Sequence, residues 1–271
     1  VPLLAVTFIK LVVPIRQVRV TCSAILVVLA ENWVATNAFI LSLFHRIYWD
    51  VQGLERVSRE GWYLITCNHQ SWTDILVLQS VFSKKAPFLK FFLKQELIWV
   101  PVMGVAWWAL DFPFMKRYTK EFLAKHPEMK GKDTETTRKA CEKFKEIPVS
   151  VMNFLEGTRF TQAKHDQQQS PYRYLLKPKA GGIAFVLSSM GGILHSMLDV
   201  TIVYNEKTIG FWDLMCGNVR HVKVRVTQRE IPAEFAAGDY ENDAEFRERF
   251  QSWVSDLWME KDALIGKLHS A

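Results

Sequence analysis

Apolar and polar positions along the chain follow two periods, one typical of strands and one typical of helices. Trp62–Cys67 is a short apolar run between Gly61 and Asn68, which indicates a buried strand. Asp74–Phe82 is apolar nearly all round, as expected for a helix that packs on both sides. The strand and the helix are therefore joined by a short polar turn.

The same alternation continues to the end of the chain. Val149–Leu155 and Val200–Tyr204 are again strand-like, and His221–Thr227 alternates apolar and charged residues with period two, so one of its faces meets water. Asp133–Ile147 is amphipathic with helical spacing, and the segment Ala244–Leu268 predicts a long C-terminal helix. Strands interleaved with helices indicate an α/β domain.

The first fifty residues have a different pattern. Val1–Ile9 and Val20–Ala30 are apolar with basic residues between them, and Asn32–Phe44 is uncharged. None of these runs reaches the roughly 18 apolar residues expected of a spanning helix, so we expect the end of one membrane helix followed by an interfacial helix. The predicted organisation is a membrane-associated helical segment at 1–50 and the α/β domain at 51–271.

Charge and cysteine content narrow the function classes. The chain has 34 Lys+Arg against 28 Asp+Glu, a net charge of +6, but no zinc-finger spacing, basic helix or stacking motif for nucleic acid. An anionic membrane or phosphate-bearing substrates fit this charge better. The segment Lys84–Lys94 interleaves lysines with apolar residues, which suits either a membrane interface or a solvated loop. The four cysteines lie far apart, which indicates reduced thiols and argues against a disulfide framework or a zinc site.

The sharpest chemical signal is the turn Asn68–Asp74, with sequence NHQSWTD. Ser71 and Asp74 have the spacing of a capping box, which places Asp74 in the first helical turn. His69 then lies in the turn before the helix, where the carboxylate can reach back to the imidazole. A histidine held in this way makes a general base, because the carboxylate orients the ring while the other nitrogen takes a proton. The alternative is that Asp74 only caps the helix and His69 is a polar turn residue.

Two further segments carry polar groups that suit a phosphate. In Phe154–Arg159 a strand runs into a turn where Gly157 allows close backbone approach, Thr158 can donate and Arg159 can grip an anion bidentately. The segment Phe112–Arg117 offers two cations after an apolar stretch. Each segment alone is compatible with an ordinary surface loop.

Together and in this order, the three segments resemble the glycerolipid acyltransferase family that includes the 1-acylglycerol-3-phosphate acyltransferases. That family carries an NHxxxxD block, a later block ending in Arg after apolar residues, and an FPEGTR-like block. The continuation through Phe160-Thr161 to Lys164-His165 is similar to the branch containing bacterial paralogues and animal lysophosphatidate and lysocardiolipin acyltransferases. The resemblance covers roughly Trp62 to Tyr204. Leu155 replaces the usual Pro of the third block, which leaves the acceptor's identity open.

The resemblance implies a single acyltransferase domain with a mixed sheet flanked by helices. It implies that His69 deprotonates the acceptor hydroxyl for direct attack on a thioester, with Asp74 orienting His69. No metal or cofactor is implied, since thioester activation already makes the acyl group transferable. The residues implied to bind the acceptor's glycerol phosphate are Asn68, Arg117, Glu156, Gly157, Thr158, Arg159 and Lys179.

The function expected from this resemblance is acyl transfer from acyl-CoA or acyl carrier protein to a lysophospholipid, 1-acylglycerol-3-phosphate first, giving phosphatidic acid. The alternatives are another lysophospholipid acceptor, of the lysocardiolipin or lysophosphatidylglycerol type, and a membrane-associated thioesterase that uses the same His–Asp pair on water. No GxSxG elbow is present to favour a hydrolase. The expected partners are membrane lipids and the acyl donor, without nucleic acid. The expected location is the cytoplasmic face of a cell inner membrane of the bacterial type, because basic residues favour that side.

Overall fold

The core of the protein is a six-stranded mixed sheet with the strand order β1-β8-β7-β2-β6-β3. Strands β7, β2, β6 and β3 run parallel to one another, whereas β8 pairs antiparallel with β7 and parallel with β1. The strand bounds are Tyr48–Gln52 (β1), Tyr63–Cys67 (β2), Leu89–Phe91 (β3), Ser150–Phe154 (β6), Ser196–Tyr204 (β7) and His221–Glu230 (β8). The computed structural model describes residues 2–115, 126, 137–139, 141–145, 147–190, 192–194, 196–206, 209–236 and 238–270.

Strand burial follows position in the sheet. β2 lies inside the sheet and all five of its residues are buried, with Leu64 in one apolar cluster and Ile65 in the other. In β8 the valines are buried while Lys223 and Arg225 are partly exposed, which confirms the period-two prediction for this strand.

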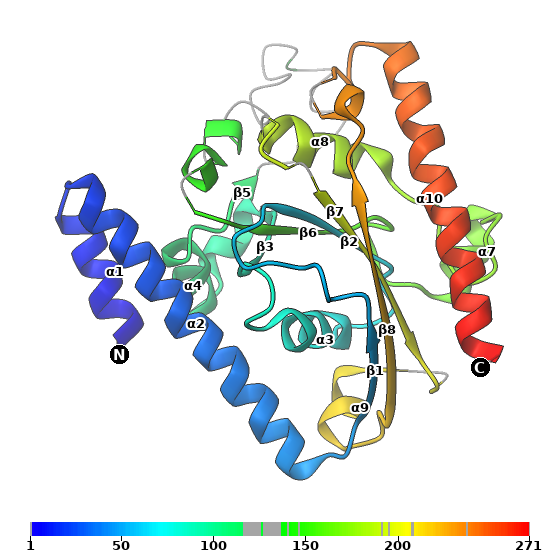
Figure 1. The fold of residues 1–271 in the computed structure, drawn as a ribbon, viewed down its shortest axis with the longest axis horizontal. Helices are drawn as coiled ribbons and strands as arrows, with labels where there is room; N and C mark the ends of the chain where they lie inside the picture. The colour runs from blue at the N-terminus through cyan, green and yellow to red at the C-terminus, as the bar shows by residue number, and fades with distance from the viewer. Residues whose placement is uncertain are drawn as a thin grey trace.

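Helices cover both faces of the sheet (Figure 1). On one face α8 (Ala180–Met190) and α10 (Ala244–Ser270) share an apolar cluster with β2, β6 and β7. On the other face α3 (Thr73–Phe82) packs on β2, β7 and β8, and Leu214 of the short helix α9 (Phe211–Met215) joins it. The predicted α/β fold with a mixed sheet flanked by helices is confirmed. Of the predicted helix Asp133–Ile147, the structure describes residues 137–139, 141–145 and 147, and Glu142–Lys145 form a short 3-10 helix.

A buried ion pair joins α10 to the sheet. Lys261, whose side chain is fully buried, lies 2.6 Å from Asp199 Oδ1 and donates to the carbonyl oxygen of Val200 at 2.5 Å. Asp199 also accepts a hydrogen bond of 3.0 Å from Thr66 of β2. Breaking one partner of such a buried pair is strongly destabilising, because the other charge is left uncompensated. The pair therefore fixes the C-terminal helix against β7.

The N-terminal helices α1 (Pro2–Val12) and α2 (Arg16–Phe44) form a hairpin along one edge of the molecule, beside α4 (Met103–Ala109) (Figure 1). Among the described residues, α2 is the one helix long and apolar enough to cross a membrane. The expectation that Val20–Ala30 and Asn32–Phe44 are each too short to span a membrane is corrected, because both belong to the single helix α2. Glu31 between them does not interrupt the helix, since its carboxylate accepts two hydrogen bonds from the Arg59 guanidinium, at 2.9 and 2.8 Å.

One face of α2 docks on the rest of the protein and the other does not. Cys22, Leu26, Ala30 and Val34 recur every four residues and are buried, and Leu26 and Ala30 share an apolar cluster with α4 and the residues that follow it. Other apolar side chains of this helix are exposed, among them Val28, Trp33, Phe39, Leu43 and Phe44. The helix ends at Phe44, and the boundary predicted at residue 50 falls inside β1, which belongs to the sheet.

Candidate active site

The turn that follows β2 is pinned to the neighbouring strand β7 by Asn68. Its fully buried amide donates through Nδ2 to the carbonyl oxygen of Ile202 and accepts through Oδ1 from the Ile202 N–H, each at 2.9 Å. The side chain thereby continues the backbone ladder between β2 and β7 beyond the last residue of β2. This contact fixes where the turn leaves the sheet, and so where His69 begins.

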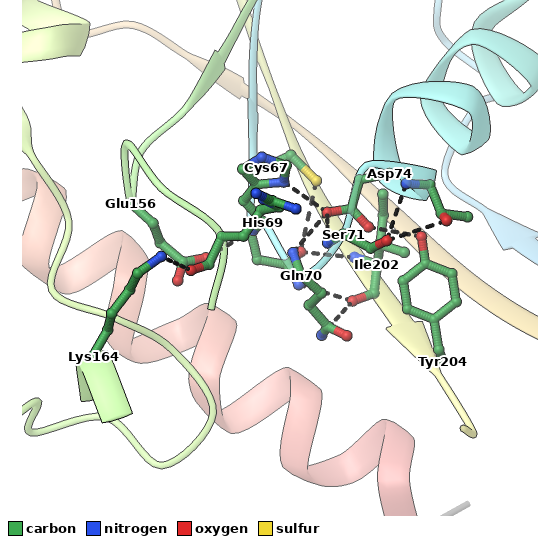
Figure 2. A network of polar contacts seen from close by, with 12 residues as sticks. Cys67, His69, Gln70, Ser71, Asp74, Glu156, Lys164, Ile202 and Tyr204 are labelled. Atoms are coloured by element: carbon green, nitrogen blue, oxygen red, sulfur yellow. Dashed lines mark hydrogen bonds and ion pairs between the residues drawn. The ribbon is translucent and has the colours of Figure 1, made fainter. Parts of the chain in front are cut away.

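His69 is oriented by Asp74, as the sequence spacing predicted. Asp74 is fully buried in the first turn of α3, and its Oδ2 accepts from the N–H groups of Gln70 at 2.6 Å and Ser71 at 2.8 Å (Figure 2). The same oxygen lies 2.8 Å from His69 Nδ1. Because a carboxylate only accepts, this contact assigns the ring proton to Nδ1 and leaves the Nε2 lone pair available. Of the expected capping box, the half in which Asp74 accepts from Ser71 is present.

The second oxygen of Asp74 is held from a distant part of the chain. Tyr204, the last residue of β7, donates its phenol hydrogen to Asp74 Oδ1 at 2.7 Å (Figure 2). Burial, and next the adjacent Asp74 carboxylate, raise the pKa of the Tyr204 phenol well above its ordinary value. The phenol therefore stays protonated and remains a donor. Sequence reasoning missed Tyr204, because an aromatic residue at the end of a buried strand carries no local signal of such a contact.

The third block holds His69 from the other side. The His69 N–H donates to Glu156 Oε1 at 2.7 Å, and the His69 carbonyl accepts from the Phe160 N–H at 2.7 Å. The imidazole stacks on the ring of Phe154, with ring centres 3.9 Å apart and an angle of 16° between planes. Backbone and ring of His69 are thus both fixed by residues at the carboxyl end of β6.

Glu156 holds the backbone of His69 from a buried position. It is 1% exposed, and its Oε2 accepts from the Leu176 N–H at 3.0 Å. Burial raises the pKa of the Glu156 carboxyl to about 7. Both Asn68 and Glu156 are buried and engage backbone groups, so in this geometry they position the turn and the third block. Their contact with the acceptor stays a prediction.

A cavity of about 530 Å³ opens beside His69. This volume is typical of a small-molecule site. The lining of the cavity has an apolar part and a polar part. The apolar part of the lining includes Phe91, Phe92, Met152, Phe185 and Val186. The polar part includes His69, Gly157, Thr158, Arg159 and Lys179.

The loop Gly157–Arg159 is shaped for close contacts. Gly157 has a φ of +66°, and a Cβ at this position would lie 2.9 Å from Lys179 Cδ, so only glycine fits without strain. Lys164 Nζ donates to Thr158 Oγ1 at 2.8 Å and to the Arg159 carbonyl oxygen at 3.0 Å, which ties the loop to α7 (Gln162–Gln168). Sequence reasoning noted Lys164 only as part of a longer motif and assigned it no role in the site.

Two cations of the cavity are available to an anion. Within the described part of the chain, neither Arg159 nor Lys179 forms a salt bridge, and the Arg159 guanidinium carbon lies 5.4 Å from the exposed Trp72 ring. Arg117, the other predicted phosphate ligand, lies outside the described residues. Arg159 and Lys179 give this part of the cavity a positive field that suits a phosphate.

Cysteine chemistry does not compete with His69 here. Burial raises the pKa of the Cys67 thiol well above its ordinary value, so it remains a neutral thiol. All four cysteines are free in this structure. In the part of the chain that the structure describes, no three His, Cys, Asp or Glu residues are grouped so as to hold a metal ion.

Comparison with known proteins agrees with this architecture. The family model described as Acyltransferase matches residues 48–205, which is more than half of the chain. The protein therefore belongs to the acyltransferase family, and the family inferred from the three blocks is confirmed.

Individual relatives are more distant. The chain is 25% identical over 252 residues to human 1-acyl-sn-glycerol-3-phosphate acyltransferase gamma, covering 88% of this chain and 60% of that protein. It is 24% identical over 237 residues to 1-acyl-sn-glycerol-3-phosphate acyltransferase 3 of Arabidopsis thaliana, covering 82% of this chain and 57% of that one. The crystal structure of the 1-acyl-sn-glycerophosphate (LPA) acyltransferase PlsC from Thermotoga maritima has the same fold. It aligns with a TM-score of 0.53 at 17% identity, over 98% of this chain and 88% of that chain.

Proposed function

We propose that this protein transfers an acyl group from a thioester to the free hydroxyl of 1-acylglycerol-3-phosphate, which gives phosphatidic acid. The observation that carries the proposal is the His69 ring, held at Nδ1 by the buried Asp74, on a cavity with both an apolar and a cationic lining. The apolar lining suits an acyl chain and the cations suit a phosphate. The names of the curated relatives support the same acceptor.

In the proposed reaction, His69 acts as a general base through Nε2. His69 Nε2 takes the proton of the acceptor hydroxyl while its oxygen attacks the thioester carbonyl carbon. The tetrahedral intermediate collapses, the carbon–sulfur bond breaks, and the leaving thiolate takes the proton from the imidazolium. Asp74 stabilises the imidazolium and keeps its orientation, as in other His–Asp pairs. Atoms and charges balance without a metal or a resident cofactor, and no acyl-enzyme is needed.

The acceptor phosphate lies, in this proposal, against Gly157, Thr158, Arg159 and Lys179. A phosphate monoester carries a charge of about −1.5 to −2 near pH 7, which matches the two cations better than a diester with a single charge. This charge argument favours 1-acylglycerol-3-phosphate over lysophosphatidylglycerol, whose one phosphate is a diester. Arg117 remains a proposed further ligand from its place in the second block.

The reaction takes place, we propose, at a membrane. The acceptor lies in a bilayer. The helix α2 is apolar, carries exposed apolar side chains and lies beside the domain that contains His69 and Asp74. Basic residues around α1 and α2 favour the cytoplasmic face of an inner membrane, where acyl-CoA and acyl carrier protein are found.

The test is a panel of lysophospholipid acceptors supplied with acyl-CoA and with acyl carrier protein, using detergent-solubilised protein and mass spectrometry of the products. Phosphatidic acid formed faster than any other phospholipid supports the proposal. Transfer chiefly to lysocardiolipin or lysophosphatidylglycerol would reassign the acceptor. Free fatty acid formed faster than phospholipid would show that the His69–Asp74 pair serves a thioesterase.

A further inference from the structure

At the junction of the 3-10 helix η1 (Gln95–Trp99) and α4 the chain forms a short apolar tip, residues 99–103. Its Trp99 and Val102 side chains are 85% and 81% exposed, more than any other large apolar side chain of the described residues. Val100 and Met103 are exposed beside them, and residues 98–110 include no Asp, Glu, Lys or Arg. Exposed apolar residues that lie together in this way mark an interaction surface, whereas single ones need no explanation.

The backbone of the tip is strained and firmly held. Val102 has φ 64° and ψ −53°, and the Met103 N–H donates to the Pro101 carbonyl oxygen at 2.7 Å, which defines a γ-turn of the rare type. A β-branched residue at a positive φ is an outlier that persists only where the surrounding structure determines it. That support comes from the start of α4, where the Gly104 N–H donates to the Val100 carbonyl oxygen at 2.8 Å. The fold thus keeps Val102 in a costly conformation in which its side chain faces solvent.

The end of α4 is fastened to the N-terminal hairpin of α1 and α2. Asp111 accepts from Lys10 Nζ of α1 at 2.5 Å and from Ser23 Oγ of α2 at 3.1 Å. Lys10 Nζ also donates to the Ala109 carbonyl oxygen at 3.1 Å. Ala109 shares an apolar cluster with Leu26 of α2, and Figure 1 shows α4 against this hairpin. Because α4 is bound to both helices, the tip at its start keeps a fixed position beside them.

The chain that leads into the tip forms part of the catalytic cavity. Phe91 and Phe92 line that cavity, and Phe91 also packs against the apolar cluster that joins α2 to α4. Residues 93–98 are all that separates these two rings from the tip along the chain. The tip is therefore connected to the apolar wall of the catalytic cavity on one side and to the hairpin on the other.

We propose that the tip inserts into the bilayer beside α2 and holds the apolar end of the catalytic cavity at the membrane. The inference rests on the proposed membrane location of the reaction. A bilayer takes up apolar side chains without requiring a matching shape or an opposite charge, and this segment has no charge to offer a protein partner. Trp99 suits the headgroup level and Val102 the acyl region below it. The acceptor then passes from the bilayer to Phe91 and Phe92 along apolar surface.

Insertion is measured with a fluorescent label at the tip. Of the four cysteines only Cys216 is exposed, so Cys216→Ser leaves buried thiols alone. In that background an environment-sensitive dye is attached to Val102→Cys and, as the matched control, to Met259→Cys, a 55% exposed position of α10 on the side of the molecule away from α2 (Figure 1). With liposomes of phosphatidylcholine and phosphatidylglycerol, a quencher on the lipid acyl chains should quench the dye at 102 about fivefold more than the dye at 259. Equal quenching at the two positions, with the protein sedimenting on the liposomes, would overturn the proposal.

Two variants separate a membrane role from a structural one. Trp99→Ser combined with Val102→Ser should lower the affinity for these liposomes about tenfold, because two exposed apolar side chains no longer enter the bilayer. Val102→Gly should also weaken binding, but it should not lower the thermal unfolding temperature, since glycine adopts the positive φ without strain. Met259→Ser is the control and should change neither quantity. A lower unfolding temperature of Val102→Gly with unchanged liposome binding would give Val102 a structural role and contradict insertion.

Activity distinguishes this inference from the proposed acyl transfer. The double variant of Trp99 and Val102 should form phosphatidic acid about tenfold more slowly from 1-acylglycerol-3-phosphate in liposomes, and at the wild-type rate from the same acceptor in detergent micelles. The wild-type rate in both preparations would overturn the role of the tip while sustaining the acyl transfer. A dye at 102 that becomes shielded without liposomes as the protein concentration rises would assign the tip to a second copy of the chain instead. If the wild type formed no product in either preparation, the acyl transfer would be overturned, and the quenching would still decide where the tip lies.

Discussion

Tyr204 and Asp74, separated by 130 residues in the chain, meet in a hydrogen bond of 2.7 Å between the phenol and Asp74 Oδ1. The other oxygen of Asp74 binds the His69 ring and two backbone N–H groups. Both carboxylate oxygens of the fully buried Asp74 therefore have hydrogen-bond partners within the protein. This network sets the conformation of the turn Asn68–Asp74.

Replacing His69 by Ala should lower kcat by about 10²- to 10⁴-fold, the usual effect of losing a general base. Folding should be retained, because the imidazole lies at the cavity and only its ring contacts are lost. The measurement is phosphatidic acid formation alongside thermal unfolding of the same preparation. His221→Ala, an exposed histidine at the start of β8, serves as the control and should keep full activity. A folded His69→Ala variant with more than half of the activity would exclude the base.

Tyr204→Phe should leave the buried Asp74 Oδ1 without its donor. An unsatisfied buried acceptor costs about 1–3 kcal/mol, which should appear in the free energy of unfolding. If the phenol also positions Asp74, kcat should fall roughly 5- to 30-fold with the KM for both substrates unchanged. Tyr63→Phe is the matched control, because its phenol accepts from the Ser58 N–H, away from Asp74. Equal kcat values for the two variants would leave Tyr204 with a purely structural role.

Arg159→Lys should chiefly weaken acceptor binding, because Lys keeps the charge but loses the planar fork that grips a phosphate. We expect the KM for 1-acylglycerol-3-phosphate to rise about tenfold, corresponding to about 1.4 kcal/mol. The KM for the acyl donor should change little. Arg249→Lys on the exposed side of α10 is the control. An increase confined to the donor KM would contradict the assignment of Arg159 to the acceptor phosphate.

The free energy of unfolding should depend on pH through the Glu156 carboxyl. Its pKa is raised from 4.5 to about 7 in the folded protein by burial, so folding favours the protonated form. The corresponding stability is fully present below about pH 4.5 and is lost as the pH rises through about 7. At 1.36 kcal/mol per pKa unit, the wild type should lose roughly 3 kcal/mol between pH 5 and pH 8 that Glu156→Gln does not lose. Denaturant unfolding of both proteins across this range is the measurement, and parallel curves would contradict the predicted titration.

The exposed face of α2 should hold the protein on a bilayer. Replacing Phe39, Leu43 and Phe44 by Ser removes exposed apolar area without touching the docked stripe, so liposome binding should fall while unfolding is unchanged. Leu26→Ala is the opposite control, because Leu26 is fully buried and its truncation should cost about 2–5 kcal/mol of stability without reducing binding. Sedimentation with anionic liposomes at high salt tests both. Undiminished binding of the triple variant would locate the membrane contact elsewhere.

Local pattern was sufficient for the features that depend on neighbours in sequence. The strand ending at Cys67, the helix after it and the five-residue spacing of His69 and Asp74 together predicted that the carboxylate can reach back to the ring, and the 2.8 Å contact confirms that it does. The order of the three blocks was likewise enough to establish the family, which the family match confirms.

Tertiary structure decided everything that depends on which strands are neighbours. The pairing of β2 with β6 and β7 brings Glu156 under His69 and Tyr204 against Asp74, and it turns Asn68 and Glu156 inward. Lys261 reaches Asp199 only because α10 returns to β7 from the far end of the chain. Glu31 stays within one continuous helix because Arg59 folds back to neutralise it. A buried charge or hydroxyl pairs with the polar group that the fold places beside it. Because that group is distant in sequence, the periodicity of residues along the chain does not predict it.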